Sequence, residues 1–500
     1  MNKKKVIVIG AGFAGLSVAS FLAKSGCDVT VLEKHSMPGG RARKFSDKGF
    51  TFDMGPSWYW MPDVFERYFK QFGKQVSDYY QLKRLDPSYR IYWEDALMDI
   101  PASYSELKAL FNQLEPGSAE KLEQFIAEAA FKYKVGIDKL VHKPGRSLTE
   151  FIDYDLISGL FRLDVFSSIK THVRKLFKNE KIRQLLEFPV LFLGALAENT
   201  PALYSLMNYA DIVGGTWYPQ NGMYEIVDAM YSVAVELGVE FEFNQDVTEI
   251  IIKDGKAIGV KASLRTADNT QLATYDADVV VGAADYHFIE TKLLPKEARS
   301  YTDKYWDTRV MAPSCLLYYV GLNKKVENLP HHSLFFDTSF EVHGKEIYTD
   351  KQWPTDPLFY VGAPSVTDKT VAPEGCENLF LLIPVATGLT GDDEKLRDKY
   401  FELIVERMEK HLKQSIKANV IYKKSFALSD FVSEYNAFKG NAYGLANTLL
   451  QTAILKPACR SKKVKNLFYT GQLTVPGPGV PPSLISGEVV AKEIIKSFHK

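Results

Sequence analysis

One six-residue segment, GAGFAG at 10–15, constrains the fold of this chain more than any other part of its sequence. A short run of mostly β-branched residues precedes it, and a helical pattern with many small residues follows it. This strand–turn–helix context is what a G-x-G-x-x-G motif requires before it indicates dinucleotide binding. We expect Gly10 to form the tight turn, Gly12 to let a pyrophosphate approach the backbone, and Gly15 to let the helix pack on the strand.

A carboxylate follows the second strand at the position where a ribose needs one. The strand at 29–32 ends at Glu33, 18 residues after Gly15. A carboxylate there hydrogen-bonds the ribose hydroxyls and disfavours a 2′-phosphate, so the sequence predicts against NADP. The N–H groups at the start of the first helix and its positive dipole end suit the phosphates. We place Phe13, Ala14 and Lys34 at the same site.

Three further segments point to a flavin. PGGRA at 38–42 brings a second glycine pair and an arginine, a fork-shaped donor for phosphate or flavin, although an ordinary Pro-Gly turn is the alternative. FTFDMGPS at 50–57 adds another glycine to the same region. A Pro/Gly-rich turn at 471–482 precedes a terminal helix, where proline suits the first turn. The positive end of that helix is expected at the flavin pyrimidine edge, where negative charge settles on reduction.

Together these motifs resemble the bacterial-type phytoene desaturases, a family of FAD-dependent carotenoid desaturases. The resemblance covers essentially the whole chain and also includes 199–201, 214–223 and 363–368. NLFYTGQLTVPGPGVPPSLISG at 466–487 is specific to that family, whereas the first glycine motif is shared by many flavoproteins. The resemblance implies an α/β fold of the glutathione-reductase/amine-oxidase type, with a discontinuous Rossmann FAD domain, a mixed α+β substrate domain and a helical membrane-facing region.

The resemblance also implies which residues contact FAD. Val247 would contact the adenine through its backbone, and of all these residues Asp285 has the weakest support from the resemblance. The predicted cofactor site comprises Gly10, Gly12, Phe13, Ala14, Gly15, Glu33, Lys34, Gly40, Arg41, Gly55, Pro56, Ser57, Val247, Asp285, Gly471, Gly479 and Val480.

Changes in composition along the chain divide it into five parts. Segments 1–57, 222–290 and 440–500 read as the FAD-binding domain, and the last carries the flavin-contacting motif. Segment 58–221 is helix-rich and aromatic and is expected to be membrane-associated, and 291–439 forms the substrate domain. A discontinuous arrangement of this kind places a ligand cleft between the domains. We expect Trp217, Tyr218 and Pro219 to line the substrate end of that cleft.

The implied reaction is desaturation of phytoene towards lycopene, by hydride transfer to flavin N5 and loss of the adjacent proton. The cofactor performs the hard step, and the protein supplies orientation and a dry pocket. No catalytic base is assigned from the sequence. The alternatives are a related desaturase or isomerase of hydroxylated or cyclised carotenoids, a non-redox prenyl-lipid-binding protein of the same fold, and a flavin amine oxidase. The terminal acceptor is oxygen or a quinone.

Composition excludes several other classes. The 61 Lys and Arg balance the 61 Asp and Glu, so a nucleic-acid partner is not expected. The four cysteines lie far apart, which supports neither a disulfide framework nor a zinc ribbon. No metal is predicted: His331 and His332 are adjacent and would point to opposite faces of a strand. No stretch is long and apolar enough to span a bilayer.

The remaining expectation concerns location. A lipid-soluble substrate favours a cytoplasmic protein held peripherally at the inner membrane. The segment 169–178 alternates apolar and basic residues and is a candidate interfacial helix, with a solvated surface face as the alternative. The lysines at 3–5 and the apolar run after them also fit a signal peptide, but dinucleotide binding accounts for that segment better.

Overall fold

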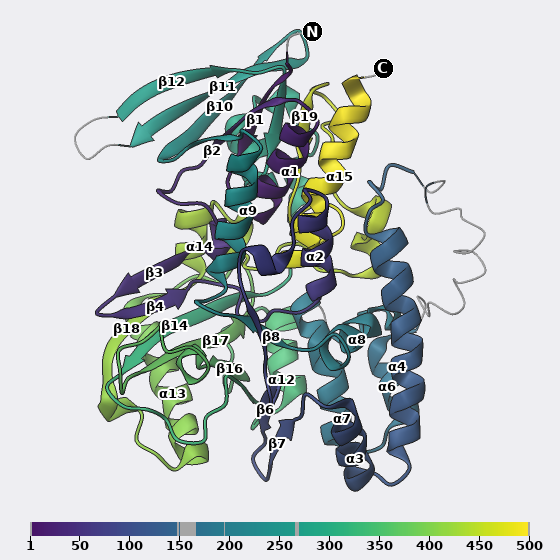
Figure 1. Cartoon of the computed structure of the whole chain (residues 1–500), viewed down its shortest axis with the longest axis vertical. Coiled ribbons are helices and arrows are strands. Elements are labelled where there is room, and N and C mark those ends of the chain that lie inside the picture. The colour runs from purple at the N-terminus through teal and green to yellow at the C-terminus, as the bar shows by residue number, and fades with distance from the viewer. Residues whose placement is uncertain (1–2, 148–149, 151–166, 195, 266–269, 499–500) are drawn as a thin grey trace.

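The computed structural model describes residues 3–147, 150, 167–194, 196–265 and 270–498 (Figure 1). Two β-sheets far apart in Figure 1 organise these residues. The upper sheet lies near both chain ends, and the lower sheet is built mainly from residues 314–426. A group of helices from residues 104–212 stands beside the lower sheet.

The upper sheet has five parallel strands in the order β19-β13-β1-β2-β9. Its strands come from three separate segments of the chain: β1 (Lys5–Ile9), β2 (Asp28–Leu32), β9 (Glu240–Glu242), β13 (Val279–Gly282) and β19 (Leu467–Tyr469). Strands β1 and β13 are almost entirely buried, as apolar runs covered on both faces should be. Tertiary pairing therefore joins the two chain ends into one domain.

Three helices cover one face of this sheet: α1 (Phe13–Lys24), α9 (Tyr224–Glu236) and α15 (Val480–Phe498). Helix α15 packs directly on α1, and the Ser17 hydroxyl donates to the Leu484 carbonyl at 2.7 Å. A Cβ at Gly487 would lie 2.5 Å from the Ser17 Cβ, so glycine permits this close approach. The predicted terminal helix began at Pro482, and the structure starts it two residues earlier.

The other face of the upper sheet is covered by an antiparallel three-stranded sheet. Its strands are β10 (Gln245–Lys253), β11 (Lys256–Arg265) and β12 (Thr270–Asp276). Asp254 and Gly255 both have positive φ at the β10–β11 turn, as a two-residue hairpin of matching twist requires. Strand β10 thereby begins next to β2, where its first residues join the predicted cofactor site.

The lower sheet has seven strands in the order β18-β14-β17-β16-β15-β6-β7. They are β6 (Tyr89–Tyr92), β7 (Leu97–Ile100), β14 (Ser314–Leu322), β15 (His332–Phe335), β16 (Phe359–Gly362), β17 (Glu377–Val385) and β18 (Val420–Phe426). Successive residues along the strands of this sheet point to opposite faces, and each face belongs to a different hydrophobic core. Tyr318 and Phe359 pack with helix α13 (Glu394–Leu412), whereas Leu317 and Tyr360 face the other way, into the core shared with the upper domain.

The remaining elements are short ribbons and surface helices. The ribbons pair β3 (Lys44–Asp47) with β4 (Phe50–Asp53) and β5 (Leu82–Arg84) with β8 (Trp217–Pro219). The helices are α2 (Pro62–Lys70), α3 (Tyr104–Leu114), α4 (Ser118–Val135), α6 (Ile169–Leu176), α7 (Glu180–Glu187), α8 (Leu206–Ile212), α10 (Tyr286–Phe288), α11 (Asp303–Asp307), α12 (Phe340–Lys345) and α14 (Leu428–Tyr435).

The candidate interfacial helix is not free to enter a membrane. In α6 the Ile169 and Val173 side chains are fully buried in the core. Two of its basic side chains form ion pairs instead, with Lys170 3.2 Å from Glu198 and Arg174 2.8 Å from Glu180. The apolar face of α6 is therefore a packing face, which corrects the interfacial hypothesis for this segment.

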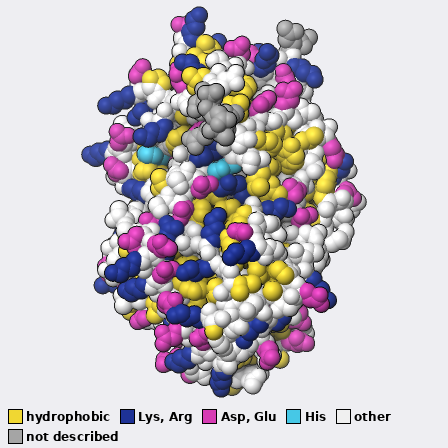
Figure 2. Space-filling model, turned by 90° about the vertical axis from the view of Figure 1, so that its left-hand side faces the viewer, with side chains coloured by type: hydrophobic (Ala, Val, Ile, Leu, Met, Phe, Trp, Pro, Cys, Tyr) yellow, Lys and Arg dark blue, Asp and Glu magenta, His cyan; other side chains and the backbone are white. Residues whose placement is uncertain are grey.

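The face at the left of Figure 1 carries acidic and basic side chains in close alternation (Figure 2). Hydrophobic side chains lie between the charged ones. No broad region of this face, within the described residues, carries a single sign of charge. This distribution agrees with the zero formal net charge of the chain. Among the residues with a described structure, no helix has the length and apolar character to cross a membrane.

Candidate active site

A large cavity of about 400 Å³ opens at the carboxyl ends of β1 and β2 and extends towards the lower sheet. Ligands of open α/β sheets bind at this edge. Apolar lining predominates: Trp58, Trp60, Leu317 and Leu382 form part of the wall towards the lower sheet. The cavity is thus a cofactor-sized cleft that continues into an apolar chamber.

The glycine turn at the start of α1 has the geometry that phosphate binding needs. Gly10 adopts φ +103°, which an L side chain rarely tolerates. A Cβ at Gly15 would lie 2.0 Å from the Gly10 carbonyl oxygen, so only glycine fits there. A Cβ at Gly12 would meet nothing within 4 Å, and no side chain caps the helix that begins beside it. The N–H groups of the first turn are therefore open to an anion from the cavity.

Glu33 is fixed by two backbone donors at the end of β2. The Ala11 N–H donates to one carboxylate oxygen at 2.8 Å and the His35 N–H to the other at 3.0 Å. The side chain is only 4% exposed, and burial raises its pKa despite these bonds. Each oxygen keeps acceptor capacity for a hydroxyl, which is what a ribose diol requires.

The PGGRA loop packs against the glycine turn. Gly40 has φ +55°, and a Cβ there would lie 3.3 Å from the Gly12 Cα. The next residue, Arg41, is half-buried; its side chain donates to the Asn441 carbonyl and lies 5.5 Å from the Tyr435 ring centre. Its Nε has no hydrogen-bond partner among the described residues. A guanidinium whose Nε is buried with a spare N–H fits an anionic or carbonyl ligand in this cavity.

The C-terminal motif closes the cavity from the other side. Helix α15 starts at Val480, immediately after Gly479, which has φ +114°. Behind the turn, the buried Lys456 ammonium donates to the Asn447 side-chain oxygen at 2.9 Å, and burial lowers its pKa to about 7. A Cβ at Gly477 would lie 2.9 Å from that same Asn447 oxygen. The turn is therefore held on its outer side by a packed polar pair.

The first residues of β10 line the far end of the cavity. Gln245 is buried, and its side-chain oxygen has no hydrogen-bond partner among the described residues. Asp285 lines the middle, where it accepts from the Phe288 N–H at 3.1 Å and the Phe438 N–H at 3.2 Å. Burial raises the pKa of Asp285, and the charge of Arg41 opposes that shift.

The residues present fit FAD. The open helix terminus at Gly12 suits the pyrophosphate, Glu33 the ribose, and the unpaired Gln245 oxygen a base amine. The unpaired Arg41 Nε adds a donor in the same cavity. These observations test the donor set of the cavity; the individual cofactor contacts stay predictions.

Most of the sequence-predicted cofactor residues lie in this one cavity lining. The lining contains Gly10, Gly12, Phe13, Ala14, Glu33, Lys34, Gly40, Arg41, Gly55, Pro56, Ser57, Val247, Asp285, Gly471, Gly479 and Val480. Gly15 lies behind the lining, where it packs α1 against the turn.

The predicted substrate-lining residues lie outside the lining of the large cavity. Trp217, Tyr218 and Pro219 are absent from the lining of the large cavity. They form β8 and pair with β5, and the Tyr218 hydroxyl donates to Asp368 at 3.1 Å. This strand pairing holds them in a ribbon outside that lining, and their role at the substrate stays a prediction.

Sequence reasoning missed the apolar wall. Trp58 and Trp60 follow Ser57 directly and could have been found from that adjacency. Leu317 and Tyr360 lie on fully buried strands, whose two faces look alike in sequence. No local signal distinguishes the face that meets the cavity.

The adjacent His331 and His332, and His343 further along the chain, have separate hydrogen-bond partners. His331 Nδ1 lies 2.8 Å from the Thr367 hydroxyl, and His332 Nδ1 lies 2.7 Å from the Tyr360 hydroxyl. His343 Nε2 lies 3.0 Å from the Pro384 carbonyl oxygen. Tyr360 lines the cavity, so its hydroxyl connects the His332 ring to the cavity.

Comparison with known proteins places this chain in a family. The profile of the flavin containing amine oxidoreductases matches residues 13–495. The chain is 40% identical to a carotenoid 3,4-desaturase of Haloarcula japonica, over 100% of this chain and 99% of that protein. It is 31% identical to a zeta-carotene-forming phytoene desaturase of Myxococcus xanthus, over 99% of this chain and 95% of that protein.

Solved structures share the fold at low sequence identity. An oxidoreductase from Methanosarcina mazei superimposes with a TM-score of 0.61 at 18% identity, over 98% of this chain and 100% of that one. A putrescine oxidase variant gives a TM-score of 0.61 at 14% identity, over 99% of both chains. These structures confirm the predicted α/β architecture of the amine-oxidase type, and they carry no argument about substrate.

Proposed function

Because the chain belongs to the flavin containing amine oxidoreductases, and among them to the carotenoid desaturases, we propose that it uses FAD to introduce conjugated double bonds into a long polyene. The observation that carries this proposal is the continuity of the cavity: the dinucleotide cradle at Gly12 and Glu33 opens into a wall of Trp58, Trp60 and Leu317. A pocket of this composition fits a hydrocarbon substrate placed against a flavin.

The chain contributes binding, orientation and exclusion of water. When bound, FAD supplies a hydride acceptor at its N5 atom. The Trp60 indole N–H donates to the Thr216 hydroxyl at 2.8 Å, which fixes that part of the wall. Leu317 and Leu382, from neighbouring strands β14 and β17, add an apolar surface that excludes water from the reacting carbons.

We propose phytoene as the substrate and lycopene as the end product, reached by successive desaturations. The similarity to the Myxococcus desaturase supports this choice. A second candidate, 3,4-desaturation of a hydroxylated or cyclised carotenoid, is supported by the 40% identity to the Haloarcula enzyme.

An anaerobic single-turnover experiment separates these possibilities. Purified, FAD-loaded protein is mixed with liposomes containing phytoene or a hydroxylated carotenoid, and flavin bleaching is followed with chromatography of the polyenes. Bleaching with phytoene, with lycopene or its intermediates as products, supports the first candidate. Bleaching only with the hydroxylated carotenoid supports the second. Protein that takes up no FAD would overturn the redox proposal and favour a lipid-binding protein. Reoxidation by oxygen or by a quinone, compared afterwards, identifies the acceptor.

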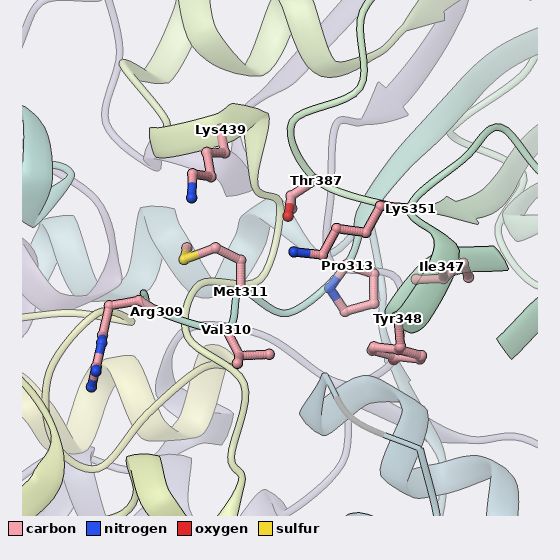
Figure 3. A pocket seen from close by; sticks show the side chains of 9 residues that line it. All are labelled: Arg309, Val310, Met311, Pro313, Ile347, Tyr348, Lys351, Thr387 and Lys439. Atoms are coloured by element: carbon pink, nitrogen blue, oxygen red, sulfur yellow. The ribbon is translucent and has the colours of Figure 1, made fainter. Parts of the chain in front are cut away.

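We propose that the protein docks peripherally on the cytoplasmic side of the inner membrane. A small pocket of about 30 Å³ supports a specific face: its rim carries Arg309, Lys351 and Lys439, and Figure 3 shows both lysines pointing towards Met311. Burial and the nearby Lys351 charge lower the pKa of Lys439. Clustered cations of this kind attract anionic lipid headgroups.

Exposed apolar side chains adjoin these cations. Val310 is 46% exposed, and Leu450 is 77% exposed. The Gln451 side-chain oxygen accepts from the Val310 N–H, and its nitrogen donates to the Val310 carbonyl. Val310 and Leu450, which precedes Gln451, therefore lie on neighbouring loops. Behind the pocket, Tyr348 lies near Tyr443 of the large cavity, which makes this face a short route for a lipid-soluble substrate.

Vesicle sedimentation tests the docking face. We expect Lys351→Glu with Lys439→Glu to reduce binding to vesicles containing anionic phospholipid, while Lys410→Glu, an exposed site on α13, leaves binding unchanged. Equal loss in both variants, or no loss in the double variant, would overturn this assignment.

A further inference from the structure

We propose that Tyr360 and His332 form the proton acceptor of the desaturation, with Tyr360 as the catalytic residue and His332 as its partner. This inference rests on the proposed function, which supplies the polyene and the oxidant. It assigns the base that the sequence leaves unnamed.

The placement of Tyr360 is the first argument. Its side chain lines the large cavity from β16, and its hydroxyl lies 2.7 Å from His332 Nδ1. The same hydroxyl also interacts with the side chain of Ser57, which follows the Gly55-Pro56 turn in the cofactor lining. Tyr360 thus bridges the predicted cofactor loop and a buried imidazole.

The surroundings of His332 are the second argument. The imidazole is 1% exposed, and its Nε2 has no hydrogen-bond partner among the described residues. Burial and the neighbouring His331 hold the pKa of His332 well below its ordinary value, so the resting ring is neutral and its Nδ1 is available to accept a hydrogen bond from the Tyr360 hydroxyl. Its ring stacks on the Trp58 indole, with centres 4.2 Å apart and planes 7° apart. An indole face stabilises the imidazolium that would form.

Three other acidic groups of the cavity are engaged in structure. Glu33 accepts from Ala11 and His35, and Asp285 accepts from two backbone N–H groups opposite Arg41. Tyr435 hydrogen-bonds and stacks with Arg43. Tyr360 is paired with a neutral imidazole instead, and a hydroxyl–imidazole pair can relay a proton without net charge in the resting state.

The reaction removes a hydride from one carbon of the polyene and a proton from the next. The substrate loses a hydride, with its electron pair, to the FAD of the proposed function, and a cation remains on the polyene. The C–H bond on the adjacent carbon breaks, and its electron pair becomes the new double bond. That proton passes to the Tyr360 oxygen while the Tyr360 proton passes to His332 Nδ1. The carbon next to an allylic cation is strongly acidic, so a weak base suffices.

Tyr360→Phe and His332→Asn test the pair, with Tyr318→Phe as a control. Tyr318 is an equally buried tyrosine on β14, on the other face of the sheet, and its hydroxyl donates to the Arg397 carbonyl. We expect each test variant to retain FAD and polyene binding, measured by flavin absorbance and tryptophan quenching. The rate of anaerobic flavin bleaching should fall by roughly 100-fold or more, and the control should match the wild type.

Two readouts separate catalysis from packing. Deuterium at the carbon that loses the proton should give a larger isotope effect in Tyr360→Phe than in the wild type. In flavin-free protein, the ¹⁵N resonance of His332 Nδ1 should shift in Tyr360→Phe, which reports the hydrogen bond independently of turnover. If the wild type bleaches and Tyr360→Phe bleaches at the same rate, the proton-acceptor assignment is overturned and the proposed function stands. A wild type that binds FAD but bleaches with no carotenoid would overturn the proposed function and this inference with it.

Discussion

The Ala11 N–H donates a hydrogen bond to the Glu33 carboxylate at 2.8 Å, which joins the glycine turn to the end of the second strand. A second donor, the His35 N–H, holds the other carboxylate oxygen. The side chain is thereby oriented before any cofactor arrives. Preorganisation of this kind reduces the entropy that a ligand must lose on binding.

Replacing Glu33 with alanine should weaken FAD binding. A hydrogen bond to a charged group contributes about 1.5–3 kcal/mol, so the dissociation constant should rise roughly 10- to 150-fold. The matched control is Glu242→Ala, an exposed carboxylate on the neighbouring strand β9 that is absent from the cavity lining. Isothermal titration of flavin-free protein measures both. Unchanged affinity in Glu33→Ala would count against the ribose role.

Gly12 and Gly15 should respond differently to the same added methyl group. A Cβ at Gly12 meets no protein atom within 4 Å, whereas one at Gly15 would lie 2.0 Å from the Gly10 oxygen. We expect Gly12→Ala to keep its thermal midpoint without FAD and to lose FAD affinity. Gly15→Ala should lower the stability itself, by about 1–3 kcal/mol or more. Equal midpoints in the two flavin-free variants would contradict this distinction.

The cofactor half of the site was predictable because its geometry is local. Gly10, Gly12 and Glu33 lie within one strand–turn–helix–strand unit, where spacing determines position. Gly471 and Gly479 lie far away in sequence, and the resemblance of the terminal motif rather than spacing predicted their place. The parallel pairing of β19 with β13 is the physical reason that they reach the cavity.

The substrate half was not predictable in the same way. Leu317 and its neighbour Leu316 are both fully buried, so the apolar pattern of β14 does not reveal which residue meets the cavity. The sequence likewise does not reveal the strand partner of Trp217, which pairs with Arg84 of β5 in the structure. The tertiary arrangement, which one sequence does not display, decides both cases.

The contact between the first and last helices should be sensitive to a single side chain. A Cβ at Gly487 would lie 2.5 Å from the Ser17 Cβ and 2.7 Å from the Ala14 carbonyl oxygen. Gly487→Val should therefore move α15 away from α1 and cost about 1–3 kcal/mol. The control, Lys496→Val, changes a mostly exposed side chain of the same helix. Chemical unfolding measures both, and equal unfolding free energies would show that α15 adjusts without strain.

Asp211 should make stability depend on pH in a defined direction. It is buried in α8, where it accepts from the Tyr89 hydroxyl at 2.7 Å and the Thr216 hydroxyl at 3.2 Å. Burial raises its pKa from 3.8 to about 6. The folded chain then keeps this proton to a higher pH than the unfolded chain does. The contribution of Asp211 to the unfolding free energy is therefore greatest below pH 4 and declines as the pH rises through 6.

Asp211→Asn removes this titration and keeps a polar side chain that can serve both hydroxyls. Relative to the wild type, the variant should gain stability between pH 4 and pH 7, by up to about 3 kcal/mol at about 1.4 kcal/mol for each unit of pKa shift. Urea unfolding at pH 4.5, 5.5 and 7.0 measures the difference. Other groups titrate equally in both proteins, so the difference in unfolding free energy reports Asp211. If that difference stays constant over this pH range, Asp211 is ionised throughout in the folded protein. The hydrogen bonds from Tyr89 and Thr216 and the nearby Arg84 charge would then outweigh its burial.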